Sequence, residues 1–160
     1  MSAEVYLKVD GVDGEATAKG FENQIVLDSF SLGANNPTSI GAGTGAGAGK
    51  VNLSNFTVTK RTDASSVPLF LACCKGNHFA GAEVTVRKAG GAQTEFIKYK
   101  FDTIFVEDIS WAGGMGDDVP IESLSLAFGA VEMTYTPQKA DGSMGSPIVA
   151  KWDQIAVAAT

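Results

Sequence analysis

The sequence predicts a mainly β domain, an antiparallel β-barrel or sandwich with one short α-helix and an extended glycine-rich loop. Three observations support this prediction. Apolar and polar residues alternate with a period of two in several segments, glycine-containing turns separate these segments, and one segment alone has a helical period. With 160 residues, of which 44% are hydrophobic and 19% charged, the chain suits a single domain over residues 1–160.

The first strand is expected over residues 5–9, where Val5, Leu7 and Val9 alternate with polar positions. Asp10-Gly11 and Asp13-Gly14 then favour turns, because both dipeptides accept positive φ. Further strands with clean alternation are expected over residues 83–87, 97–102, 123–128 and 131–136. Gly129-Ala130 is expected to form a tight hairpin between the last two.

Two other segments change face midway, over residues 24–33 and 51–60. A phase slip of one residue is typical of a β-bulge or a corner, and barrels close through such corners. We therefore expect two curved barrel strands here. Residues 138–147 are expected to form a loop, and residues 151–157 a final strand.

The helical segment places Val67, Phe70, Leu71 and Cys74 at positions i, i+3, i+4 and i+7. Asp63, Ser65 and Ser66 are each available as N-cap, Lys75 lies in the last turn, and Gly76 favours the end of the helix. The apolar stripe is expected to cover an open end or side of the barrel.

Composition excludes several classes of protein. The net charge of −6 argues against a nucleic-acid partner, and the short basic pairs Lys60-Arg61 and Arg87-Lys88 are expected at the surface or at subunit contacts. No apolar run approaches the roughly 20 residues that span a bilayer, so no membrane partner is expected. The segment Met1-Ser2-Ala3-Glu4 has no basic or apolar region of a Sec signal peptide, which predicts a cytoplasmic starting point.

No catalytic, cofactor or metal site is expected, and the protein is not predicted to be an enzyme. His78 is the single histidine, which excludes multi-histidine metal sites, and it is expected in a loop after the helix. Cys73 and Cys74 are adjacent and point apart on a helix, so they are expected to be small buried apolar residues. Asp117-Asp118 lacks the ligand spacing of a calcium loop and is expected to be a solvated turn.

The glycine run over residues 41–50 invites a phosphate-loop interpretation, which fails on spacing. A relaxed dinucleotide pattern also fails, because it must open a helix and the residues that follow are predicted to form a strand. Two interpretations stay open: a flexible connector, or a loop ordered by a partner subunit. In the second, the subunit-interface residues are Gly41, Gly43, Thr44, Gly45, Gly47 and Gly49.

Ser29 and Ser31 lie on one of the strands that changes face. Small hydroxyl side chains replace apolar residues on the same face, so this face is expected to meet water. If the sheet lines a tube, Ser31 is the expected contact to the lumen and its contents.

Six segments resemble, in the same order, the Hcp (haemolysin-coregulated protein) family of bacterial type VI secretion systems. They are residues 6–15, 56–61, 69–73, 85–91, 122–128 and 135–138. The first reads YLKVDGVDGE, a strand that runs into an acidic turn with glycines. The resemblance is spread over nearly the whole chain and does not depend on a single motif.

This resemblance implies a structural component of the secretion tube. Homohexameric rings would stack inside a contractile sheath and beneath a spike protein, be expelled from the cytoplasm without a Sec signal, and carry effector proteins in the lumen. A monomeric β-barrel that binds a ligand, or an adhesin-like module, is the alternative. The mass of the protein in solution separates the two.

Overall fold

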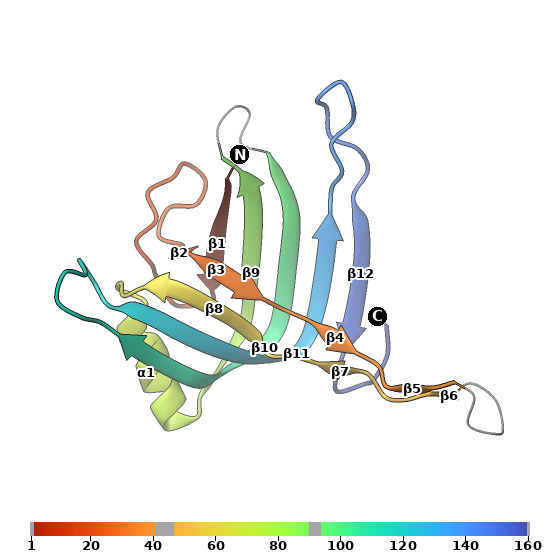
Figure 1. Ribbon diagram of the computed structural model, residues 1–160, viewed down its shortest axis with the longest axis horizontal. Helices are drawn as coiled ribbons and strands as arrows, with labels where there is room; N and C mark the ends of the chain where they lie inside the picture. Colours follow the sequence, from red (N-terminus) through yellow and green to blue (C-terminus); the bar gives the residue numbers. More distant parts are fainter. Residues whose placement is uncertain (1, 41–46, 90–93, 160) are drawn as a thin grey trace.

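The computed structural model describes residues 2–40, 47–89 and 94–159. Eight strands form one antiparallel sheet in the order β2-β1-β9-β10-β11-β8-β3, with β12 paired to β11, and this sheet curls into a nearly closed barrel (Figure 1). The strands are β1 (Ala3–Val9), β2 (Ile25–Leu27), β3 (Ser29–Ser31), β4 (Ala34–Asn35), β5 (Thr38–Ser39), β6 (Gly47–Ala48), β7 (Asn52–Leu53), β8 (Phe56–Arg61), β9 (His78–Lys88), β10 (Glu95–Ala112), β11 (Ile121–Tyr135) and β12 (Ile148–Asp153), and the helix is α1 (Ser66–Lys75). The predicted fold class is confirmed.

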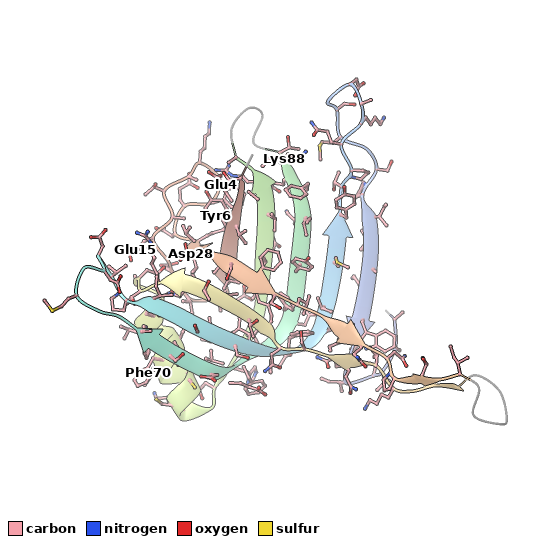
Figure 2. All side chains as sticks on the ribbon, viewed as in Figure 1. Glu4, Tyr6, Glu15, Asp28, Phe70 and Lys88 are labelled. Atoms are coloured by element: carbon pink, nitrogen blue, oxygen red, sulfur yellow. The ribbon has the colours of Figure 1, made fainter. Side chains whose placement is uncertain are left out.

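The barrel closes at a corner centred on Asp28, which Figure 2 labels. The strand before it, β2, pairs with β1 at one end of the sheet, and the strand after it, β3, pairs with β8 at the other end. The backbone N–H of Asp28 donates to the carbonyl of Thr59 at 2.8 Å. The phase slip over residues 24–33 is therefore a corner, as expected.

The other phase slip has a different cause. Residues 51–60 contain two strands, β7 and β8, and only β8 belongs to the barrel sheet. The loop expected over residues 138–147 is present, whereas the last strand is β12, Ile148–Asp153, and begins earlier than expected. It begins there because Ile148 pairs with Tyr135 at the end of β11.

The expected hairpin at Gly129-Ala130 is wrong, since both residues lie inside the 15-residue strand β11. The neighbouring strand β10 departs from regular geometry at the same level, where Thr103 has a φ of 57°. Asp102 pairs with Ala130 and Ile104 with Phe128, so Thr103 and Gly129 form a shared irregularity in the ladder. The change of apolar phase marks a bend in two long strands and not a turn between short ones.

The helix α1 occurs where it was predicted, after the N-cap Ser65, and ends at Gly76, which adopts the left-handed conformation. The helix turns a different face to the barrel from the one expected. Leu69 and Ala72 face the barrel, while Val67 is 73% exposed and Phe70 47% exposed. The helix carries two apolar stripes, and the barrel wall takes the one in which small Ala72 allows close approach.

The main core fills the barrel with side chains from the inward positions of the long strands. Its centre is formed by Phe56, Phe101 and Phe128. The ring centroid of Phe101 lies 4.9 Å from that of Phe56 and 4.8 Å from that of Phe128. Aromatic contacts at these distances add to the burial of apolar area. Both Cys73, which is half-buried, and Cys74, which is exposed, depart from the burial expected of them.

A second, smaller cluster lies outside β1, where the segment after Val9 folds back over Tyr6. The rings of Tyr6 and Phe21 stack at 4.5 Å, and the guanidinium of Arg87 lies over both rings. Arg87 is buried and pairs with Glu4 at 2.6 Å, so its expected surface position is wrong. The planar guanidinium can stack on the rings and bind the carboxylate together.

Gly14 fixes how this covering segment meets β2. A Cβ atom at position 14 would lie 2.5 Å from the carbonyl oxygen of Gln24, closer than any side chain tolerates. By contrast, Gly11 takes a φ of 80°, which is the positive value that its turn requires. The two glycines of the acidic turn are thus needed for different reasons.

We expect Gly14→Ala to lower the free energy of unfolding by about 1–3 kcal/mol, because the backbone of Gln24 must move to accept the added methyl group. Gly33→Ala is the control, since its Cβ would make only an ordinary 3.8 Å contact with Ser54. Denaturant titration of both variants measures the difference. Equal stability of the two would contradict the close approach.

Candidate assembly interface

A buried polar network lies beneath the N-terminus of α1. Lys60 and Glu122 are both fully buried, and Nζ of Lys60 lies 2.9 Å from Oε2 of Glu122. The same ammonium donates to Asp63 at 2.9 Å and to Ser66 at 3.0 Å. Lys60 was expected at the surface; it is buried because two carboxylates and a hydroxyl replace its water.

Trp111 connects this network to the outside. Its indole N–H donates to Oε1 of Glu122 at 2.7 Å. The residue as a whole is 41% exposed, and its ring meets that of Phe70 in α1 edge-on, with the ring centroids 5.6 Å apart. Val67 and Leu71 are exposed beside Phe70 on the same helix. We call Val67, Phe70, Leu71 and Trp111 the helix patch; Figure 2 shows Phe70 at the lower margin of the molecule.

A face of small hydroxyl side chains covers the outside of the wall formed by β3, β8, β11 and the end of β10. Strand register aligns these residues in two rows that cross all four strands. One row is Ser29, Thr59, Ser123 and Ser110, and the other is Ser31, Thr57, Ser125 and Asp108. These residues line a shallow hollow of about 300 Å³. We call this surface the hydroxyl face.

Ser31 is exposed, as expected, and lies at the edge of this face. Its neighbours were missed by the sequence analysis, although a signal existed. Thr57 and Thr59 alternate with the buried residues Phe56 and Val58 at a period of two. Reading the polar phase of that strand, and not only its apolar phase, would have found the face.

Charged residues of alternating sign cross the other wall of the barrel, on its outside. The register of five strands aligns Lys8, Glu83, Lys100, Glu132 and Lys151 in one row. Lys151 and Glu132 lie 3.1 Å apart, and Lys100 and Glu83 lie 4.0 Å apart. We call this row the charge ladder. The barrel thus presents a polar surface with one carboxylate, that of Asp108, on one wall and a surface of alternating charges on the other.

A two-stranded ribbon projects from the barrel, and we call residues 34–40 and 47–53 the arm (Figure 1). It contains two short ladders, β4 with β7 and β5 with β6. Gly47 lies in β6, and Gly49 donates its N–H to the carbonyl of Pro37 at 2.7 Å. Gly41, Gly43, Thr44 and Gly45 lie outside the described residues. Of the expected residues that the structure describes, Ser31 lies on the hydroxyl face, and Gly47 and Gly49 lie on the arm.

The remaining candidate residues lie apart from one another. His78 is the first residue of β9 and not a loop residue; it is exposed, with its ring 5.3 Å from that of Phe105. Asp117 and Asp118 are exposed in a turn, as expected. Across the described ranges, no group of three metal-ligating side chains is found. In the same ranges, no helix has the length and apolarity to cross a membrane.

Comparison with known proteins gives a consistent result. The family described as "Type VI secretion system effector, Hcp" matches residues 6–135. Protein hcp1 of Pseudomonas aeruginosa is 36% identical over 155 residues, which cover 96% of each chain. A solved structure of a type six secretion system protein has a TM-score of 0.94 at 31% identity and covers 99% of this chain and 100% of its own. Hcp1 from Salmonella typhimurium has a TM-score of 0.83 at 28% identity, with both chains fully covered.

We expect Glu122→Gln to lower the free energy of unfolding by about 3–5 kcal/mol, because it removes the charge opposite buried Lys60. Oε2 of Glu122 has no hydrogen-bond partner among the described residues. The ion pair with Lys60 is therefore the interaction that offsets the cost of burying this carboxylate oxygen. Chemical denaturation measures the loss.

Two controls accompany this variant. Lys60→Met combined with Glu122→Leu removes both charges and should recover most of the stability. Lys151→Ala removes an exposed ion pair and should cost less than about 1 kcal/mol. If Glu122→Gln lowered the free energy of unfolding no more than Lys151→Ala does, the buried pair would contribute no more to stability than an exposed pair.

Proposed function

The chain belongs to the Hcp family and is a type VI secretion tube protein, and on that premise we propose that six copies form a ring and that rings stack into the tube. The observation that supports the ring is the arm. An isolated two-stranded ribbon is only marginally stable in water, so a ribbon that extends away from its own barrel needs a surface on another molecule. A second copy of the chain provides one.

The two walls of the barrel suggest how each copy faces within the ring. We infer that the hydroxyl face lines the lumen and that the charge ladder faces outward. Short hydroxyl side chains give a polar, nearly uncharged surface that can hydrogen-bond to many proteins without holding any of them through strong ion pairs. Such a lining suits a channel that carries effector proteins and releases them. The contractile sheath would meet the outside of the tube, and the spike protein its end.

The proposed role is mechanical, without catalysis, cofactor or nucleic-acid partner. Six copies of a chain with a net charge of −6 repel nucleic acid and strongly acidic cargo. As a member of a secreted family, the protein would wait in the cytoplasm and leave the cell when the tube is fired. The alternative, a monomeric ligand-binding or adhesin-like module, would have a solution mass near 16.6 kDa, whereas the ring would have six times that mass.

Deleting residues 41–49 should leave a folded monomer that no longer forms rings or stacks, because the arm loses its tip and its close contact to Pro37. Light scattering coupled to size-exclusion chromatography measures the mass, and circular dichroism checks the fold. Deleting residues 139–143 from the other long hairpin is the control and should leave the ring intact. Unchanged ring mass in the first variant would show that the arm has no part in assembly.

Ser31→Asp should leave the mass of the ring unchanged and reduce the amount of effector protein that co-purifies from cells with an active secretion system. Six added carboxylates change a nearly uncharged lining into an acidic one, which disfavours acidic cargo. The control is Ser146→Asp, at an exposed position on the long hairpin. If both variants retain equal cargo, Ser31 does not face the lumen.

A further inference from the structure

We propose that Asp108 selects the cargo of the tube, because it places one carboxylate on the hydroxyl face and so favours proteins that present a basic segment to that face. The inference rests on the proposed function, in which six copies form a ring and the hydroxyl face lines its lumen. It adds the class of partner, which is a protein surface with exposed lysine or arginine side chains.

The hollow in the hydroxyl face combines many neutral groups with one charge. Of the described residues that line it, most are serine or threonine, and Asp108 alone is charged. A hydroxyl group both donates and accepts hydrogen bonds, so it adapts to almost any peptide surface. The hydroxyl rows therefore provide contact without selection, and the carboxylate provides the discrimination between partners.

A β-bulge in β10 turns Asp108 toward this face. Val106 is buried and pairs with Leu126. Asp108, two residues later, is exposed and pairs with Ser125, which is only one residue away from Leu126. Glu107 is therefore the extra residue of the bulge. Strict alternation would place Asp108 on the inward face with Val106, and the extra residue reverses that phase.

The two carboxylates at the bulge differ in their partners. Oε2 of Glu107 accepts a hydrogen bond from Nδ2 of Asn55 at 2.5 Å, and the same amide donates to Oγ of Ser125 at 3.1 Å. The ion pairs found within the described ranges do not include Asp108. The charge of Asp108 is thus available to another molecule, whereas Glu107 is engaged by Asn55.

The chemistry of the hollow disfavours other occupants. A metal ion needs several ligating side chains, and no group of three occurs in the parts of the chain that the structure describes. A small molecule needs a pocket that encloses most of its surface, and this hollow is shallow. An acidic protein is repelled by the carboxylate and by the net charge of −6 on each copy. A basic protein segment is the occupant that fits.

The selection gains strength from repetition around the ring. A single exposed ion pair contributes little to binding, because solvent and salt screen it. In the proposed ring, six Asp108 carboxylates face one lumen, so a cargo protein with several basic side chains meets more than one of them. Linked contacts of this kind raise the overall affinity, although each contact breaks easily. Cargo is therefore selected and can still be released.

Charge reversal at position 108 tests the proposal on rings of the full chain. The probes are two fluorescein-labelled peptides of equal length, one of alternating lysine and serine and one of alternating glutamate and serine. Fluorescence anisotropy at low salt measures their affinities. Asp108→Asn should weaken binding of the lysine peptide by about fivefold or more. Asp108→Lys should weaken it further and strengthen binding of the glutamate peptide, an exchange that a merely structural role would not produce.

The control is Asp118→Asn, which removes the same charge from an exposed turn outside the hydroxyl face and should leave both affinities unchanged. Light scattering checks that each variant forms rings, and Asp108→Ser, which matches its neighbours, replaces any variant that does not. If Asp108→Asn and Asp118→Asn rings bind the lysine peptide equally well, the proposal is overturned and the proposed function stands. A wild-type chain that is monomeric at all concentrations overturns the proposed function, and this inference with it.

Discussion

The bend shared by β10 and β11 is the constraint on which the rest of the structure depends. Thr103 and Gly129 occupy the same level of the ladder, and beyond them both strands turn from one wall of the barrel into the other. Two strands of 18 and 15 residues therefore serve both walls, and both of the polar outer surfaces lie partly on them. A flat sheet of the same residues would leave no interior for Phe101 and Phe128.

The same bend also creates the place that α1 occupies. β9 begins opposite Phe105, so the part of β10 beyond the bend has no β-strand on that side, and α1, which directly precedes β9, packs against β10 instead. The chain between β3 and β8 leaves the barrel as the arm instead of crossing it directly. A ribbon that its own barrel does not support is unfavourable in a solitary molecule. The arm is therefore what makes self-association a physical expectation and not only a family property.

The sequence predicted the elements better than it predicted their connections and orientations. Alternation of period two located most of the barrel strands, a corner within residues 24–33 and the exposed position of Ser31, because these features depend on local pattern. The hairpin predicted at Gly129-Ala130 was wrong because a bend in a long strand and a turn between short strands give the same change of phase. The helix was placed correctly, but the face that it turns to the barrel was wrong, since two apolar stripes compete and only packing against the barrel decides between them.

Lys60 and Arg87 were assigned to the surface because the partners that compensate their charges, Glu122 and Glu4, are distant in the sequence.

The buried network around Lys60 is better understood through orientation than through stability. A buried ion pair often contributes little net stability compared with apolar residues of the same shape, because its desolvation cost offsets the attraction. Here the pair connects β8 to β11, and its partners Ser66 and Trp111 extend it to α1 and to the end of β10. Charges and hydrogen bonds have directions, whereas apolar contacts between a helix and a sheet tolerate sliding. The network therefore fixes where Trp111 and α1 lie relative to the end of β10, and a surface that must match an identical neighbour needs that fixed geometry more than it needs additional stability.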